Sequence, residues 1–306
     1  MRAQAVFLTV DPAHYEVSYR INPWMQPDSW QQDAVRLRQE AQQAYASLCS
    51  SLRGAGCEVI SVSGPPGVPD LVFTANAAIV MEGRALMARF RYPERQAEEP
   101  AYLKIFEELQ AQGRLHEVRQ LPPGCYQEGA GDCIWDAKRG LFWAGHGPRS
   151  SLHAIPYIRD FFGVEVVPLE LTSEYCYHLD VCFCPLSGGE ILYFPPALSE
   201  VARRQLARRV PRDLLIEASE EDLRHFSVNA INLGRLIIMN RTTDALRKVL
   251  RDRGYQVVEL DLSPFMMSGG SAYCLTLRLD RGRRDGTASG QAPDHDGGLQ
   301  QRDGTG

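Results

Sequence analysis

The sequence predicts an α/β protein in which small sheets are surrounded by helices. Short apolar runs of strand length alternate with longer segments whose apolar residues recur at helical spacing. The order strand, strand, helix, strand recurs about five times along the chain. No repeat of the amino-acid sequence accompanies this rhythm, so the repetition concerns structure alone.

The individual elements follow from apolar periodicity and from the residues at their ends. The first predicted helix, 31–53, ends at Gly54, and the last, 242–253, has Thr242 or Thr243 as its N-cap and ends at Gly254. Other helices are predicted at 102–112, 150–162 and 199–208. Residues 71–73 and 77–80 form an apolar run. Strands are predicted for the other short apolar segments: a first strand ending at Asp11-Pro12, then 57–62, 84–90, 141–145, 164–169, 181–185, 191–194, 214–217, 228–231, 236–239, 257–260 and 275–279.

Size and composition are those of an ordinary globular protein with a substantial core. The chain has 306 residues, of which 44% are hydrophobic and 23% charged, and its formal net charge is -5. This acidic balance provides no basic field for nucleic acid or an anionic membrane. No run approaches the roughly eighteen apolar residues of a membrane span, so none is predicted.

The N-terminus and the cysteines indicate a cytoplasmic protein. Residues 1–10 lack the apolar core and cleavage site of a signal peptide, so the eight cysteines are expected to be reduced. Cys182 and Cys184 alternate along a predicted strand and are interpreted as small apolar residues. No second Cys/His pair completes a zinc site, and no dinucleotide or phosphate-loop fingerprint is present. We therefore predict neither a metal nor another cofactor.

The composition changes at Arg281. From there to residue 306 Gly, Asp, Arg, Gln and Ser dominate, and Leu299 is almost the only apolar residue. Such a segment cannot bury enough apolar surface to fold. We predict one domain over residues 1–280, followed by a disordered tail over 281–306.

Cys274 is the strongest candidate for a catalytic residue. It follows Gly269-Gly270-Ser271, where small residues allow backbone and ligand to approach closely, and it precedes an apolar strand. A cysteine in such a strand is more often a packing residue. A catalytic interpretation therefore requires an activating base and an environment that lowers the pKa of the thiol.

Two other polar blocks supply candidate partners for this thiol. In Tyr177-His178-Leu179-Asp180, strand geometry would direct His178 and Asp180 to one face, where one transfers protons and the other binds a cation. In the block 128–132, glycines let Glu128 project from a tight turn. The residues alone leave open a structural histidine and a plain turn.

Further polar candidates lie inside or beside apolar runs. Thr74 and Asn76 interrupt such a run and need partners if they are buried. Arg89 and Arg149 adjoin strand ends, where a guanidinium group can hold a carboxylate in a bidentate manner. Surface salt bridges are the alternative for both arginines.

Taken together, these blocks resemble the guanidine-modifying superfamily of arginine deiminases, dimethylargininases and amidinotransferases. Within it, the sequence most resembles the arginine dihydrolases found at the N-terminus of cyanobacterial arginine-degrading proteins. The resemblance covers about residues 5 to 280 and is carried by the segments 21–25, 69–77, 94–96, 128–132, 143–145, 177–180, 182–186 and 269–277.

The resemblance implies a single-domain, five-bladed, pseudo-symmetric β/α propeller, the pentein fold, with the site at its centre. It implies that Cys274 attacks the guanidinium carbon and that His178 protonates the leaving ammonia and then activates water. Glu128 and Asp180 would hold the guanidinium group.

The resemblance also implies the ligands for the rest of the substrate. Arg89 and Arg149 would bind its α-carboxylate, and Asn22, which matches an asparagine of the dihydrolase pattern, would line the site. The substrate would be a small guanidino compound, either L-arginine or a methylated arginine. No cofactor, nucleic acid or membrane is implied, and the oligomeric state stays open.

Asn76 distinguishes this chain from the arginine deiminases, which carry aspartate at that position. A neutral amide holds a cation less strongly than a carboxylate does and suits a neutral ureido group better. The resemblance therefore favours hydrolysis of arginine through citrulline to ornithine, ammonia and CO₂. The dimethylargininases differ because no aspartate follows their His-Leu pair as Asp180 does here. Dimethylarginine hydrolysis, arginine deimination, amidino transfer and a non-catalytic propeller remain the alternatives.

Overall fold

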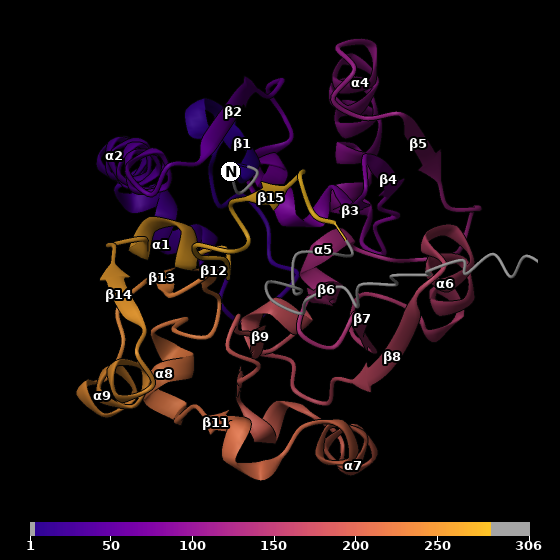
Figure 1. The fold of residues 1–306 in the computed structure, drawn as a ribbon. Coiled ribbons are helices and arrows are strands. Elements are labelled where there is room, and N and C mark those ends of the chain that lie inside the picture. Colours follow the sequence, from indigo (N-terminus) through magenta and orange to yellow (C-terminus); the bar gives the residue numbers. More distant parts are fainter. Residues whose placement is uncertain (1–3, 283–306) are drawn as a thin grey trace, which may run out of the picture.

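Five three-stranded sheets surround a common centre in the computed structural model, which describes residues 4–282 (Figure 1). Each sheet is one blade, so the predicted five-bladed propeller is the observed architecture. The first blade consists of β15 (Leu277–Arg278), β1 (Val6–Asp11) and β2 (Glu58–Ser63), and the second of β3 (Ala78–Met81), β4 (Arg84–Met87) and β5 (Glu117–Gln120). The third consists of β6 (Cys133–Asp136), β7 (Leu141–His146) and β8 (Glu165–Glu170), and the fourth of β9 (Phe183–Pro185), β10 (Ile191–Tyr193) and β11 (Leu215–Glu217). The fifth consists of β12 (Ile231–Leu233), β13 (Leu236–Met239) and β14 (Gln256–Glu259).

Helices connect the strands and cover the outside of the ring. The α-helices are α1 (Pro27–Gln32), α2 (Ala34–Gly54), α3 (Pro93–Gln96), α4 (Glu98–Ala111), α5 (Gly129–Asp132), α6 (Ile155–Phe162), α7 (Glu200–Arg209), α8 (Glu220–Arg224), α9 (Asp244–Asp252) and α10 (Ser263–Met266). Short 3-10 helices are η1 (Pro12–His14), η2 (Pro69–Val72), η3 (Thr74–Asn76), η4 (Leu152–Ala154), η5 (Leu179–Val181), η6 (Pro195–Ala197) and η7 (Arg212–Leu214).

Each blade has one antiparallel and one parallel strand pair. The first two strands of a blade pair antiparallel, and the third pairs parallel with the second. Parallel neighbours require a long crossover, and an outer helix supplies it: α2, α4, α6, α7 and α9 in the five blades. In the first blade, β15 from the end of the described chain pairs with β1, which closes the ring.

Local signals explain where the helices begin and which faces they bury. Thr243 is the N-cap of α9, because its hydroxyl accepts a hydrogen bond from the amide of Leu246. In α2, Leu48 and Leu52 are fully buried at helical spacing, and the predicted stop at Gly54 coincides with its last residue. None of the described helices is long and apolar enough to cross a membrane.

Two predicted strand assignments are wrong near the centre of the ring, and the apolar run 71–73 forms no strand. Residues 71 and 72 lie in η2, and residue 73 follows it. His178 precedes η5, and Asp180 lies within it. Cys274 lies in a turn before β15. In each place the chain turns inward before it joins a blade, so its apolar residues are buried although its backbone forms no strand ladder. The predicted tail falls outside the described residues from 283 onward.

Candidate active site

The centre of the ring is built from the segments that lead into the blades. The turn η3 precedes β3, α5 precedes β6, η5 precedes β9, and residues 227–230 and 271–276 precede β12 and β15. Asn76, Glu128, Asp180 and Cys274 lie on or beside four of these segments. The pseudo-symmetry therefore brings together residues that are far apart in the sequence.

Cys274 is buried and has two polar neighbours. Its Sγ donates a hydrogen bond to Oδ2 of Asp180 at 3.1 Å and accepts one from Nδ2 of Asn229, also at 3.1 Å. Oδ1 of Asn229 in turn accepts a hydrogen bond from the backbone amide of Cys274 at 3.2 Å. The thiol is thus fixed between a carboxylate and an amide.

The charged forms of both Cys274 and Asp180 are disfavoured in this structure. Burial raises the pKa of the Cys274 thiol well above its ordinary value, and the Asp180 carboxylate raises it further. Burial also raises the pKa of Asp180 to about 7, against the hydrogen bonds from Cys274 and Asn229. The second carboxylate oxygen, Oδ1, is buried without a hydrogen-bond partner among the described residues. A cation placed against Asp180 would supply that partner and favour both charged forms.

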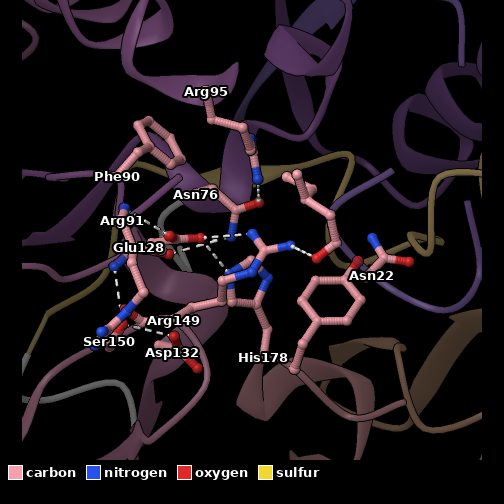
Figure 2. Close-up of polar contacts among 12 residues, drawn as sticks. Asn22, Asn76, Phe90, Arg91, Arg95, Glu128, Asp132, Arg149, Ser150 and His178 are labelled. Atoms are coloured by element: carbon pink, nitrogen blue, oxygen red, sulfur yellow. Dashed lines mark hydrogen bonds and ion pairs between the residues drawn. The ribbon is translucent and has the colours of Figure 1, made fainter. Parts of the chain in front are cut away.

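Glu128 and His178 form a second buried pair. Nε2 of His178 lies 2.6 Å from Oε2 of Glu128, which also accepts a hydrogen bond from Nη1 of Arg149 at 3.1 Å (Figure 2). The other oxygen accepts the backbone amide of Arg91. Burial alone would raise the pKa of Glu128, but Arg149 and His178 hold it well below its usual range. Glu128 is therefore a fixed anion that orients the imidazole.

A hydrogen-bonded chain supports this pair. The amide of Glu128 donates to Oγ of Ser150, which donates to Oδ2 of Asp132 at 2.6 Å. Oδ1 of Asp132 accepts the amide of Leu179, the residue next to His178. Burial raises the pKa of Asp132 to about 6. The 128–132 turn and the η5 segment are thereby held in one arrangement.

Asn76 bonds to the Glu128 segment and lies near Asp180. Its Oδ1 accepts a hydrogen bond from Nη1 of Arg95 at 2.9 Å, and its Nδ2 donates to the backbone oxygen of Glu128 at 3.1 Å. A Cβ atom on Gly131 would overlap this amide nitrogen and would lie 3.5 Å from Oδ2 of Asp180. Glycine at 131 therefore allows Asn76 and Asp180 to share the space above the turn.

Arg149 joins the cluster, whereas Arg89 does not. The guanidinium of Arg149 lies between the rings of Tyr92 and Tyr177, 4.7 and 4.6 Å from their centroids, and Nη2 donates to the backbone oxygen of Ile21. The guanidinium of Arg89 instead pairs with Glu99 at 2.7 Å and donates to the Leu121 carbonyl. The salt-bridge alternative therefore describes Arg89, because its donors pair with Glu99 and the Leu121 carbonyl.

Asn22 lies beside the cluster. Its Nδ2 donates to the backbone oxygen of Ser268 at 3.0 Å, and its Oδ1 accepts the amide of Trp24. A Cβ atom on Gly269 would approach Oδ1 of Asn22 to 3.1 Å. Asn22 therefore fixes the loop that leads to Cys274, without a recorded contact to Cys274, His178 or Glu128 among the described residues.

Sequence reasoning missed three buried polar residues of this region. Asn229 contacts the thiol, and Arg95 holds Asn76 while it forms a bidentate pair with Glu98. Asp70 accepts the Tyr19 hydroxyl at Oδ2, whereas its buried Oδ1 has no partner among the described residues. Burial raises the pKa of Asp70, against the charge of Arg95. A polar residue inside an apolar run was the available signal for Asp70 and Asn229.

Metal ligation has no candidate cluster here. Within residues 4–282, no group of three or more His, Cys, Asp or Glu side chains is arranged to hold a metal ion.

Comparison of sequences relates the chain to enzymes of guanidino compounds. The family model described as N,N dimethylarginine dimethylhydrolase, eukaryotic, matches residues 15–281. The bifunctional arginine dihydrolase/ornithine cyclodeaminase AgrE of Nostoc sp. is 39% identical over 285 residues, covering 93% of this chain and 39% of AgrE. The N(G),N(G)-dimethylarginine dimethylaminohydrolase of Mycobacterium tuberculosis is 32% identical over 268 residues, covering 88% of this chain and 83% of that protein. The chain spans about two fifths of the length of its bifunctional relatives.

Comparison of structures confirms the pentein propeller and supports the same relationship. The N-terminal domain of ArgZ, solved with substrate and described as an arginine dihydrolase from the ornithine-ammonia cycle in cyanobacteria, has a TM-score of 0.84 at 37% identity, covering 92% of this chain and 100% of that one. A dimethylarginine dimethylaminohydrolase adduct with S-methyl-L-thiocitrulline shares the fold, with a TM-score of 0.72 at 18% identity over 90% of this chain and 99% of that one. The chain therefore belongs to the N,N dimethylarginine dimethylhydrolase family, within the guanidine-modifying group that its motifs resemble.

Proposed function

We propose that this protein is a cysteine hydrolase of L-arginine that forms ornithine, ammonia and CO₂ without a cofactor. One observation carries the proposal. The buried thiol of Cys274 donates to a carboxylate, Asp180, whose other oxygen is buried without a partner among the described residues. The Glu128–His178 pair supplies a proton-transfer group, and Asn76 bonds to the backbone oxygen of Glu128. We also propose residues 1–280 as one catalytic domain.

Three charged groups fit the three charged groups of arginine. The unpartnered oxygen of Asp180 suits a guanidinium N–H, and the unpartnered oxygen of Asp70 suits the α-ammonium group. Arg149 is held by two aromatic rings and suits the α-carboxylate. To bind that carboxylate, Arg149 would exchange one of its present acceptors, Glu128 or the Ile21 carbonyl.

The first half of the reaction converts arginine to citrulline. Binding of the cation favours ionisation of Cys274, whose proton passes to His178, and the thiolate forms a bond to the guanidinium carbon. His178 protonates one amino group, the C–N bond breaks, and ammonia leaves a covalent thiouronium on sulfur. Water deprotonated by His178 then adds to the same carbon, and the C–S bond breaks to give citrulline. Covalent catalysis divides one difficult step into two easier ones.

The second half repeats this chemistry on the ureido group. The thiolate bonds to the ureido carbon, His178 protonates the departing ammonia, and a thiocarbamate remains on Cys274. Water displaces the sulfur to give the carbamate of ornithine, which decomposes to ornithine and CO₂. The neutral amide of Asn76 suits this neutral substrate, because it faces the centre without a charge of its own.

The comparisons support this assignment at the level of relatives. ArgZ structures are described as bound to substrate, to product and, in an asparagine-to-serine variant, covalently to a reaction intermediate. These structures contain the N-terminal domain of ArgZ, and this chain covers 100% of that domain in the substrate complex. Dimethylarginine hydrolysis is the second candidate, since the Mycobacterium tuberculosis relative carries that name. Free thiols at all eight cysteines agree with the cytoplasmic location that we infer.

The products formed from each substrate test the proposal. Purified protein would be incubated separately with arginine, citrulline, dimethylarginine and agmatine, and ammonia would be counted per substrate consumed. We expect two ammonia per arginine, with ornithine. One ammonia with accumulating citrulline would identify a deiminase, and dimethylamine would identify a dimethylargininase. No turnover of any guanidino compound would support the non-catalytic alternative.

A further inference from the structure

The five-fold arrangement identifies a position in each blade that faces the centre. Asn76 lies two residues before β3, Asp180 three before β9 and Cys274 three before β15. In the third blade this place is taken by the glycine turn that follows Glu128. In the fifth blade, the residue two positions before β12 is Asn229. Asn229-Ala230 before β12 also repeats Asn76-Ala77 before β3.

Asn229 is fully buried, and its side chain is completely used. Nδ2 donates one hydrogen to Sγ of Cys274 at 3.1 Å and the other to the backbone oxygen of Asp180 at 3.0 Å. Oδ1 accepts the amide of Cys274 at 3.2 Å, and the backbone oxygen of Asn229 accepts the amide of Tyr273. One amide thus joins the two segments that carry the thiol and its carboxylate partner.

We propose that Asn229 is a further catalytic residue, whose side-chain N–H stabilises the thiolate of Cys274 by a hydrogen bond to sulfur. The proposal rests on the proposed function only in taking this thiolate as the nucleophile. In the free site, Sγ donates a hydrogen bond to Asp180 and accepts one from Asn229. Once the thiol proton is lost, the contact to Asp180 becomes a repulsion between two anions. The Asn229 N–H then remains as a donor to sulfur.

The surroundings of the sulfur make this donor important. Two titratable groups face Cys274 from neighbouring segments. They are the carboxyl group of Asp180, in η5, and the buried phenol of Tyr177, which lies just before η5. Both are anions when ionised, and burial itself also disfavours the thiolate. The backbone hydrogen bond of Ser271 and the side-chain hydrogen bond of Asn229 act in the opposite direction and lower the pKa of the thiol. A hydrogen bond to an ion is stronger than one between neutral groups.

Two substitutions separate this role from a structural one. Asn229→Ala removes the whole amide. Asn229→Asp has nearly the same shape and keeps an acceptor for the Cys274 amide, but it replaces the donor to sulfur with an anionic oxygen. Asn240 is a matched control, because it is also buried and joins two segments through His225 and Leu262 without a recorded contact to Cys274.

The experiment measures the alkylation of Cys274 by iodoacetamide from pH 6 to 10, in which sulfur bonds to carbon and iodide leaves. Mass spectrometry of the Cys274 peptide gives the rate, and steady-state kinetics with arginine gives kcat and KM. We expect Asn229→Ala to raise the apparent pKa of alkylation by about one unit, a tenfold loss of thiolate at fixed pH. We expect kcat to fall about 10- to 100-fold with little change in KM. Asn229→Asp should raise that pKa further.

The controls decide between the outcomes. Asn240→Ala should lower the thermal stability but leave the pKa of alkylation unchanged. Equal pKa values in wild type, Asn229→Ala and Asn229→Asp would overturn the proposal, as would equal shifts in the Asn240 control. If Asn229→Ala does not fold, Asn229→Asp decides the result. A wild-type protein without arginine turnover would contradict the proposed function, whereas the alkylation profile would still test the hydrogen bond.

Discussion

At the scale of single residues, the site combines a nucleophile that resists ionisation with a carboxylate that lacks a partner. Burial raises the pKa of both Cys274 and Asp180, so the resting pair is most stable with its protons in place. A bound guanidinium would reverse this preference at both groups. Substrate binding and activation of the nucleophile are therefore one event in this account.

The identity of residue 76 should decide how many ammonia molecules are released per arginine. We expect Asn76→Asp to consume arginine and to accumulate citrulline, with ornithine formation reduced at least about tenfold. The new carboxylate would pair with Arg95, hold a guanidinium more tightly, and place an oxygen against the backbone oxygen of Glu128. Amino-acid analysis of the products measures the ratio. Continued ornithine formation at the wild-type rate would contradict this role of Asn76.

The two arginines that the sequence could not distinguish should differ in their effects. We expect Arg149→Gln to raise KM for arginine about 10- to 100-fold, because it removes the proposed carboxylate ligand. Arg89→Gln should leave KM unchanged and lower the free energy of unfolding by at most about 1 kcal/mol, since its ion pair with Glu99 is partly exposed. Steady-state kinetics and thermal unfolding of both variants test this contrast. An equal rise in KM would return Arg89 to the site.

At the scale of the elements, the active centre consists of the turns that precede the blades. Each turn is fixed by its own blade and by contacts to neighbouring turns. The amide of Ala75 donates to the backbone oxygen of Cys274, and Asn229 bridges Cys274 and Asp180. Side chains placed on such short, mutually bonded turns are held rigidly, as a preorganised site requires.

Gly131 tests this close approach of the turns. We expect Gly131→Ala to reduce kcat more than about tenfold, because a Cβ atom there would displace the amide of Asn76 next to Asp180. Gly54→Ala is the control, since it lies at the end of α2 with no atom within 4 Å of an added Cβ. It should keep full activity and change the free energy of unfolding by no more than about 1 kcal/mol. Full activity of Gly131→Ala would show that the turns adjust more easily than the structure indicates.

The sequence predicted most outer elements but not how the central turns lie. Helical periodicity and caps located α2 and α9 because those signals are local. The strand assigned around His178 and Asp180 was wrong, although both side chains reach the centre by way of η5. Asn229 carries no glycine block, so only its place before β12 identifies it. Arg89 and Arg149 have similar sequence surroundings, and tertiary contacts alone separate them.

At the scale of the whole molecule, closing the ring with β15 brings five chain-distant turns together and buries several ionisable groups. The raised pKa values of Asp180, about 7, and Asp132, about 6, mean that their charged forms are disfavoured in the folded state. The stability associated with each protonated carboxyl is present below about pH 4 and is lost as the pH rises through the folded pKa. The site therefore lowers the stability of the free protein near neutral pH.

Comparison of wild type with Asp180→Asn measures this cost. Other ionisable groups contribute similarly to both proteins, so the difference in stability reports mainly on residue 180. We expect the advantage of the variant over wild type to grow by about 1–3 kcal/mol as the pH rises from 5 to about 7, and to stay constant from there to pH 8. Thermal or denaturant unfolding across this range measures it. A difference that does not vary with pH would mean that Asp180 ionises normally in the free protein.

The central claim is that Cys274 attacks the carbon of a guanidino substrate, and acid quenching during turnover tests it most directly. Wild-type protein would be mixed with excess arginine, quenched within the steady state, digested and analysed by mass spectrometry, with Cys274→Ser as the control. The account predicts a substrate-derived adduct on the peptide that contains Cys274, and loss of at least about a thousandfold in turnover for the control. Retention of ammonia release by Cys274→Ser would contradict the account.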